Sequence, residues 1–297
     1  MRILLTGAEG FVGTHIRNGV ICVPLSDGGN SVDIRDTDKL RRIIAAIRPD
    51  MVIHLAAQSF VPQSFSAPID TFHVNFIGTY NLLTALKAIN FRGKMLFVGS
   101  GDAYGLVRPD LLPISEIYPQ KPRSPYAVSK VAAEALCYQW SQTESFEIVM
   151  VRPFNHIGPG QSDRFVISDF ARQVVEIKLS MRRPVIQVGD IDVTRDFTDV
   201  RDVIRAYELL LERGVNGEIY NVCSGRERSV REALDMLIRQ AGIEVQIIRD
   251  PTRLRNAEQR RMFGSCAKLK ETTGWQPEIS FEQSLRDILA DWENKLL

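Results

Sequence analysis

The sequence predicts an α/β fold in which a doubly wound parallel sheet carries a smaller, interleaved C-terminal lobe. In the first half of the chain, short apolar runs bounded by turn residues alternate with longer amphipathic stretches. This alternation is typical of buried parallel strands joined by helices. A cluster of glycines directly follows the first apolar run, as at a tight turn from a strand into a helix.

Four apolar runs are predicted to be buried strands, at residues 3–5, 51–55, 94–98 and 147–151. A shorter strand is predicted at residues 20–25, after the first helix. The intervening segments are long enough for right-handed crossovers, with helices expected at residues 11–17, 38–48, 70–90 and 125–143. Ligands of such a sheet bind at the carboxyl ends of its strands.

The pattern loosens after about residue 160. Helices are predicted at residues 165–179, 201–213 and 229–241, with strand-like pieces at 184–188 and 218–222. No Pro-, Gly- or Ser-rich linker separates the halves. We therefore expect residues 1–160 to form mainly the first domain, and residues 161–297 mainly a smaller lobe interleaved with the last strands of the sheet.

The composition excludes several classes of partner. Among 297 residues, 37 are basic and 36 acidic, so a formal charge of +1 provides no long-range field for nucleic acid or an anionic membrane. Any anionic ligand must be bound by local arginines. No apolar stretch is long enough to cross a bilayer and none precedes the first strand, which predicts a cytoplasmic protein without a membrane partner.

The cysteines give no sign of a metal site. Cys22, Cys137, Cys223 and Cys266 are widely scattered and include no CxxC pair. Neither a zinc site nor a disulfide framework is indicated. They are interpreted as packing residues in a reducing compartment.

The glycine cluster has a spacing that suits a dinucleotide. Gly7, Gly10 and Gly13 form a GxxGxxG pattern, with Phe11 and Val12 opening the helix that follows. The first glycine permits the turn, the second lets backbone amides approach a pyrophosphate, and the third allows close packing of helix on strand. The first half is therefore predicted to be a Rossmann-type domain.

The choice between NAD(H) and NADP(H) stays open at this stage. An acid at the end of the second strand would accept a hydrogen bond from a ribose hydroxyl. Asp27 follows Gly7 by about the number of residues that is typical of NAD binding. However, Asp27 also lies in a glycine-rich turn, where a solvated residue is equally expected. Use of both cofactors is therefore allowed.

A candidate acid–base pair begins the helix at residue 125. Ser124 is predicted to cap it, with Pro125 in its first turn, so Tyr126 and Lys130 lie one turn apart on one face. A neighbouring ammonium would lower the pKa of a phenol and suit it to proton transfer. Because Tyr-x-x-x-Lys is common by chance, the pair alone is weak evidence.

The strand at residues 94–98 ends in Gly99-Ser100-Gly101-Asp102, and its end points toward the same cleft. The order of glycine loop, Ser100, Tyr126 and Lys130 resembles the extended short-chain dehydrogenase/reductase family over nearly the whole chain. That resemblance implies that Ser100 hydrogen-bonds a substrate carbonyl, Tyr126 delivers the proton and Lys130 holds the nicotinamide ribose. It also implies cofactor contacts from Asp33, Ile34, Leu55, Ala56, Ala57, Asn75 and Arg152. His54 and His156 are expected to serve packing or loop hydrogen bonds.

Substrate recognition is predicted for the second half. Arg195, and Arg255 with Glu258 in an R-x-x-E pair, could bind a diphosphate and a ribose diol, although residues 253–261 would equally suit a solvated basic loop. These stretches resemble the GDP-mannose 4,6-dehydratase branch. The resemblance implies a GDP-linked 4-keto-6-deoxyhexose as substrate, with Asn155 and Val166 among its contacts.

The residue at position 102 distinguishes the enzymes of that branch by the reaction that they catalyse. A dehydratase resembling this chain would carry Thr and Glu at the positions of Ser100 and Asp102, and an epimerising synthase a cysteine at the latter. The shorter Asp102 favours a reductase that acts on the C4 keto group of GDP-4-dehydro-6-deoxy-D-mannose. GDP-D-rhamnose is the expected product, while the face of the ketone that is attacked, and so the D-rhamnose or D-talose configuration, stays open. The alternatives are a dehydratase that uses Asp102 and a non-catalytic dinucleotide sensor. The helices at 70–90 and 125–143 correspond to those of the family's four-helix homodimer interface.

Overall fold

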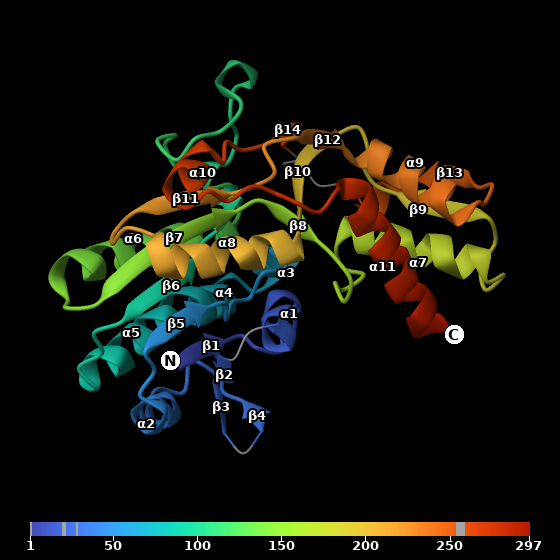
Figure 1. Cartoon of the computed structure of the whole chain (residues 1–297). Coiled ribbons are helices and arrows are strands. Elements are labelled where there is room, and N and C mark those ends of the chain that lie inside the picture. Colours follow the sequence, from blue (N-terminus) through green and yellow to red (C-terminus); the bar gives the residue numbers. More distant parts are fainter. Residues whose placement is uncertain (1, 20–21, 28, 254–258) are drawn as a thin grey trace.

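The computed structural model describes residues 2–19, 22–27, 29–253 and 259–297. Its main element is a six-stranded parallel sheet with the strand order β11-β7-β6-β5-β1-β2 (Figure 1). This confirms the predicted doubly wound parallel sheet. The strands are β1 (Ile3–Thr6), β2 (Cys22–Pro24), β5 (Met51–His54), β6 (Lys94–Val98), β7 (Glu147–Pro153) and β11 (Ile219–Val222).

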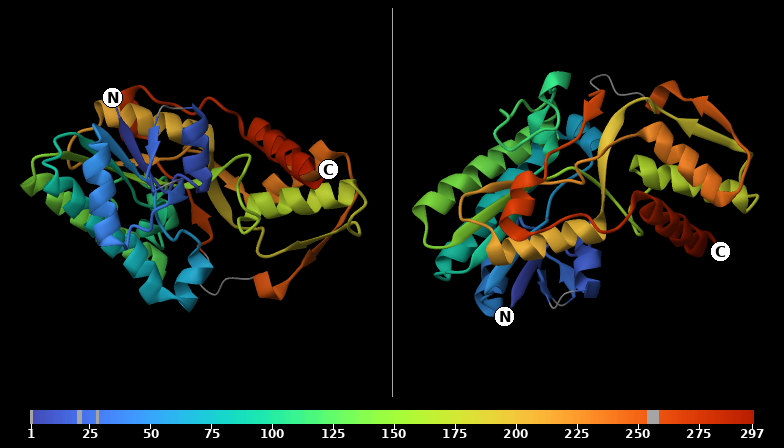
Figure 2. Two further views of the ribbon diagram at one scale, coloured as in Figure 1. Left: turned by 90° about the horizontal axis from the view of Figure 1, so that it is seen from below. Right: turned by 45° about the horizontal axis from the view of Figure 1, so that its top comes forward.

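Both faces of the sheet are covered by helices. Alternate strand residues point to opposite faces: Leu4 packs in the cluster with α2, α5 and α6, whereas Ile3 and Leu5 pack in the cluster with α1, α8 and α10. Figure 2 shows these two helical layers from other directions. The helices are α1 (Phe11–Gly19), α2 (Thr37–Ile47), α5 (Gly78–Ala88), α6 (Pro125–Thr143), α8 (Val200–Arg213) and α10 (Ala267–Thr273).

A smaller lobe lies beyond the carboxyl ends of the sheet strands (Figure 1). Its core contains Phe170 of α7, Leu234 of α9 and Leu285 of α11, all fully buried. The three helices pack with a two-stranded parallel sheet. The elements are α7 (Val166–Lys178), β9 (Val185–Val188), α9 (Val230–Ala241), β13 (Gln246–Arg249) and α11 (Phe281–Leu296).

A further small sheet lies between the main sheet and the lobe. In it β10 pairs antiparallel with β12 and parallel with β14 and β8. Its strands are β8 (Asn155–Ile157), β10 (Thr194–Asp199), β12 (Glu227–Ser229) and β14 (Arg261–Met262). The C-terminal half also supplies β11 to the edge of the main sheet. The division of domains near residue 160 stays a prediction.

Two predicted elements differ from the structure. In the described part of the strand predicted at residues 20–25, the structure has β2 (Cys22–Pro24), which ends one residue earlier than predicted, and a short hairpin of β3 (Ser26–Asp27) and β4 (Asn30–Ser31) follows it. The helix predicted at 70–90 is divided into α4 (Pro68–Phe72), a π-helical turn (His73–Ile77) and α5.

The remaining short elements are α3 (Val61–Ser66) and three 3₁₀ turns at Gly101–Tyr104, Pro109–Leu111 and Pro251–Arg253. Among the described residues, no helix combines the length and the apolar character needed to span a bilayer.

Candidate active site

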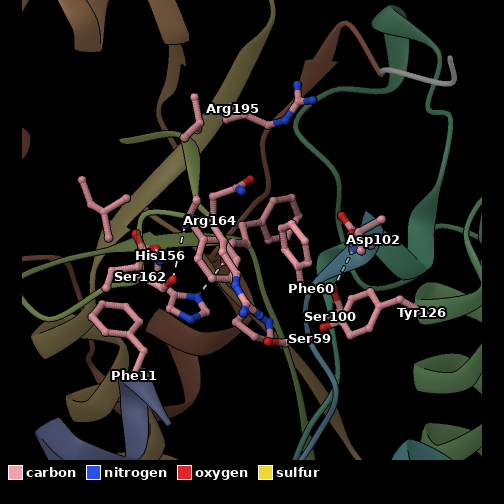
Figure 3. Close-up of a pocket in the computed structure, with 18 of the residues that line it drawn as sticks. Phe11, Ser59, Phe60, Ser100, Asp102, Tyr126, His156, Ser162, Arg164 and Arg195 are labelled. Carbon is pink, nitrogen blue, oxygen red and sulfur yellow. Dashed lines mark hydrogen bonds between the residues drawn. The ribbon is translucent and has the colours of Figure 1, made fainter. Parts of the chain in front are cut away.

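One large cavity lies between the carboxyl ends of the main sheet and the smaller lobe. Its volume is about 1670 Å³, and both halves of the chain contribute to its wall. Figure 3 shows Ser100, Asp102 and Tyr126 together on one side of it, with Phe11 and His156 on the other. The cavity is large enough for a dinucleotide and a second ligand together.

The glycine loop forms the floor of this cavity where β1 passes into α1. Gly7 has a φ of 70°, and a side chain there would place its Cβ 2.7 Å from Ala56 N. At Gly13 a Cβ would lie 2.3 Å from Gly7 O. Only glycine is compatible with either position. The loop therefore forms a cradle at a helix N-terminus, which fits the pyrophosphate of the predicted dinucleotide.

Most of the predicted cofactor residues line the cavity, but not all of them. Those that line it are Gly7, Gly10, Phe11, Val12, Gly13, Leu55, Ala56, Ala57, Tyr126 and Lys130. Asp33, Ile34, Asn75 and Arg152 are not among the lining residues. Their predicted contacts with the cofactor stay predictions.

The Asp33 carboxylate is held by a neighbouring cation. Arg35 Nε lies 3.0 Å from each carboxylate oxygen and Arg35 Nη2 lies 2.7 Å from Oδ2, while Arg35 Nη1 donates to Asp70. The hydrogen bonds from Arg35 lower the pKa of Asp33. Asp27, the other acid considered for the ribose, forms ion pairs with Lys39 and Arg42.

Asn75 lies in the π-helical turn and supports the cavity wall from behind. Its Oδ1 accepts a hydrogen bond from Gln58 N at 2.8 Å, and its Nδ2 donates to Gln58 O at 3.1 Å and to Ser129 Oγ at 2.9 Å. A π turn shifts the register of a helix by one residue and often occurs at functional sites. Here it joins α6 to the loop that follows β5.

The predicted capping of α6 is confirmed and places the acid–base pair. Ser124 Oγ accepts a hydrogen bond from Ala127 N at 3.1 Å, and Pro125 is in the first turn. Tyr126 and Lys130 are both buried on one face of the helix and line the cavity. Ser100, at the end of β6, lies beside Tyr126 on the same side of the cavity (Figure 3).

The ionisation of Tyr126 differs from the prediction. Burial raises its pKa, the charge of Asp102 raises it further, and the neighbouring Ser100 hydroxyl opposes both effects. Burial lowers the pKa of Lys130 to about 8, against the charges of Cys137 and Glu134. Tyr126 therefore keeps its proton at neutral pH, as required of a group that donates one.

Arg152 lies behind the acid–base pair. Its guanidinium forms two hydrogen bonds with Glu134 of α6 and stacks over the Tyr104 ring at 4.7 Å. Both charged side chains are almost fully buried. The ion pair ties the end of β7 to α6, one turn beyond Lys130.

His54 belongs to a closed hydrogen-bond chain. Its Nδ1 lies 2.7 Å from Thr6 Oγ1 and its Nε2 lies 2.9 Å from Thr79 Oγ1. Because Thr79 donates its own proton to Asn75 O, His54 Nε2 must donate to Thr79, and Thr6 donates to Nδ1. Burial and the charge of Lys130 lower the pKa of His54 to about 3. This neutral histidine fits the predicted packing role.

The predicted substrate residues Asp102, Asn155, Val166 and Arg195 also line the cavity. Arg195 Nη1 donates to Gln259 O at 2.8 Å, which holds the segment entering β14. The predicted pair of Arg255 and Glu258 lies outside the described residues.

Several lining residues were not predicted. The Arg164 guanidinium lies 5.8 Å from the centre of the Phe60 ring, which meets the Phe165 ring edge-on at 6.3 Å. Phe60 follows the main sheet strand β5, whereas Phe165 caps α7 of the lobe, so these rings join the two halves. Residues in irregular loops carry no periodic signal, and only the run of polar turn residues before Phe165 indicates that a loop ends there. Arg123 is a further lining arginine that was missed, whereas Arg172 and Arg253, which also line the cavity, belong to stretches considered for substrate recognition.

The chain resembles known proteins over its full length. The family model for GDP-mannose 4,6 dehydratase matches residues 30–288. A GDP-6-deoxy-D-mannose reductase from Pseudomonas aeruginosa is 48% identical over 99% of this chain and 98% of the relative. A GDP-mannose 4,6-dehydratase from Yersinia enterocolitica is 29% identical over 87% of this chain and 77% of the relative.

A solved structure gives the same result for the fold. RMD from Pseudomonas aeruginosa, complexed with NADPH, superposes with a TM-score of 0.93 at 47% identity and covers 99% of both chains. Nearly every element of the present fold therefore has a counterpart in a protein that binds NADPH.

Proposed function

The chain belongs to the GDP-mannose 4,6-dehydratase family, and from that premise we propose that it reduces the C4 keto group of GDP-4-dehydro-6-deoxy-D-mannose to give GDP-D-rhamnose. It is an oxidoreductase of the GDP-6-deoxy-D-mannose reductase type. The observation that carries the proposal is that Ser100 and Tyr126 lie together in the cavity wall, beside Asp102, which stands where a dehydratase would need a longer acid (Figure 3).

Reduction of a ketone requires a hydride, a proton and stabilisation of the developing alkoxide. Bound NADPH supplies the hydride. Tyr126, neutral because burial raises its pKa, donates the proton. Ser100 Oγ accepts a hydrogen bond from Asp102 N at 3.1 Å, so its own hydrogen is left to donate toward the carbonyl oxygen. The two hydroxyl groups thus converge on one oxygen.

The cofactor is held in the part of the cavity that the first half of the chain lines. The glycine loop from Gly7 to Gly13 provides the cradle for the pyrophosphate, and Lys130 the ammonium for the nicotinamide ribose. We propose NADPH as the main donor, on the basis of the NADPH-bound relative, with NADH also accepted. Dissociation constants for both measure the preference.

The substrate occupies the part of the cavity next to the lobe. We propose that Arg195, Asn155 and Val166 contact the GDP-sugar. We propose the same for Arg255 and Glu258, because their R-x-x-E spacing resembles that of the GDP-mannose 4,6-dehydratase branch. Asp102 is one methylene shorter than the acid with which a dehydratase abstracts the C5 proton, so it would reach that carbon poorly.

The experiment that tests this assignment is identification of the product. The enzyme is incubated with NADPH and the ketosugar, and the configuration at C4 is read by nuclear magnetic resonance. GDP-D-rhamnose is expected, whereas the C4 epimer would refute the assigned product. Release of ketosugar from GDP-mannose without added reductant would instead identify a dehydratase.

The apolar surface of α5 and α6 supports a homodimer. Ile77, Tyr80, Val128 and Tyr138 are exposed on the π-helical turn and on these helices. We propose that two copies pair there as a four-helix interface, in a cytoplasmic enzyme. Sedimentation should give a dimer for the wild-type protein and a monomer for Tyr138→Asp. A wild-type monomer would refute the interface.

A further inference from the structure

Two cysteines that are distant in the sequence share one site behind the cavity. Cys223 directly follows β11, and Cys266 directly precedes α10. Both pack in the cluster formed by Tyr104, Phe154 and Met262. The two thiol groups lie close enough for each to shift the pKa of the other.

A single buried carboxylate brings the two segments together. Asp196 of β10 accepts hydrogen bonds from Gly225 N at 3.0 Å and Gly264 N at 3.4 Å. A Cβ at Gly264 would lie 2.9 Å from Cys223 Sγ, and one at Gly225 would lie 3.8 Å from Cys266 Sγ. Each sulfur therefore lies against the glycine of the opposite segment.

Asn221 fixes the same junction from the other side. Its Nδ2 donates to Ser265 O at 3.4 Å and to Ile114 O at 2.9 Å, while its Oδ1 accepts from the Tyr104 hydroxyl at 2.6 Å. Asn221 is fully buried. The thiol pair is thus held by polar groups on both segments, which makes its geometry a fixed feature of the fold.

The two thiols differ in reactivity. Cys266 is partly exposed, and the interaction with the neighbouring Cys223 thiol lowers its pKa to about 7, against the opposing effect of burial. Burial raises the pKa of Cys223 well above its usual range. Cys266 is therefore the nucleophilic thiolate at neutral pH, with Cys223 as its neutral neighbour.

We propose that Cys266 and Cys223 form a modification site, at which a hydroperoxide oxidises the two thiols to a disulfide. The Cys266 thiolate attacks one peroxide oxygen, the O–O bond breaks, and hydroxide leaves and is protonated to water, which gives a sulfenic acid. The Cys223 sulfur then attacks the sulfenic sulfur, and the hydroxyl leaves with the Cys223 proton as a second water. Two thiols lose two electrons in total and one peroxide gains them.

The site also contacts the wall of the cavity. A Cβ at Gly264 would lie 2.6 Å from the Phe154 ring, and one at Gly101, next to Ser100, would lie 3.3 Å from Phe154 and from Met262. Disulfide closure shortens the sulfur separation to about 2.05 Å, which must shift this closely packed wall. If the proposed reductase reaction holds, oxidation is expected to raise the KM for the ketosugar several-fold while NADPH affinity is unchanged. The thiol chemistry itself does not depend on that reaction.

The test treats the native full-length protein with hydrogen peroxide, alkylates the remaining thiols after denaturation, and maps the peptides by mass spectrometry. The expected product has lost two alkylatable thiols and contains one linked pair, Cys223 with Cys266, which dithiothreitol reverses. Cys22→Ser and Cys137→Ser are matched controls and should behave as the wild type. Four alkylatable thiols after treatment, or a sulfinic acid on Cys266 without any disulfide, would overturn the proposal.

A second measurement uses the wild-type protein alone and needs no variant. The rate of alkylation of each cysteine in the native wild-type protein is followed against pH. Cys266 should reach half its maximal rate near pH 7, whereas Cys22, whose pKa burial raises, should react only at alkaline pH. A Cys266 that reacts no faster than Cys22 at pH 7 would contradict the proposed thiolate.

Discussion

Arg152 and Glu134 form a buried ion pair with two hydrogen bonds, 2.9 Å between Nε and Oε2 and 2.6 Å between Nη2 and Oε1. The side chains are 4% and 5% exposed. Although burial opposes its charged form, Glu134 holds the pKa of Arg152 above its usual range. This pair fixes α6 against β7 and so supports the position of Lys130.

Removing one partner of this pair should destabilise the protein strongly. Glu134→Ala leaves the Arg152 charge buried and unpaired, which costs about 3–5 kcal/mol. Urea unfolding measures the loss. The matched control is Glu212→Ala, because Glu212 is exposed and lies 3.8 Å from Arg213. Equal stability of the two variants would show that the buried pair contributes nothing.

Tyr126→Phe should reduce turnover by about 10² to 10⁴-fold, because it removes the proton donor. NADPH affinity should be largely retained, since the phenyl ring keeps its packing. Tyr138→Phe, on the exposed face of the same helix, is the control and should turn over normally. Near-normal turnover of Tyr126→Phe would refute its assignment as proton donor.

The affinity for NADPH should decrease above about pH 8. Burial lowers the pKa of Lys130 to about 8. The side chain is therefore protonated and positively charged below that pH, and it loses this charge above it. Titration calorimetry across pH 7 to about 9.5 should show up to a tenfold weakening per pH unit above the pKa. Lys130→Met should bind more weakly at neutral pH, without this pH dependence. A wild-type affinity that stays constant to the alkaline limit would contradict the role of Lys130.

The free energy of unfolding should decrease as the pH falls, because the buried His54 stays neutral in the folded protein. Its pKa is about 3 in the folded protein and about 6.5 in the unfolded chain, so between these values only the unfolded chain binds the proton. The free energy of unfolding should therefore decrease by up to about 1.4 kcal/mol per pH unit below pH 6.5. In His54→Asn this contribution should be absent. Parallel pH curves for the two proteins would contradict it.

The sequence predicted the elements whose signals are local. The strands at 51–55 and 94–98 are apolar runs, and the cap of α6 needs only Ser124 and Pro125, so both were found. The π-helical turn at His73–Ile77 was not predicted, because Asn75 gains its role from Gln58 and Ser129, which belong to other elements.

The same limit applies to the site. Gly7, Ser100, Tyr126 and Lys130 were found because their spacing carries the chemistry, and all four line the cavity. The burial that raises the pKa of Tyr126 exists only after folding. The pairing of Cys223 with Cys266 depends on Asp196, which lies in a third segment, so no spacing in the sequence could indicate it.

The most direct test of the reductase assignment follows the absorbance of reduced nicotinamide with each sugar supplied separately. We expect oxidation of NADPH when GDP-4-dehydro-6-deoxy-D-mannose is added and none with GDP-mannose alone. No oxidation with the ketosugar, together with formation of ketosugar from GDP-mannose, would contradict it and identify a dehydratase.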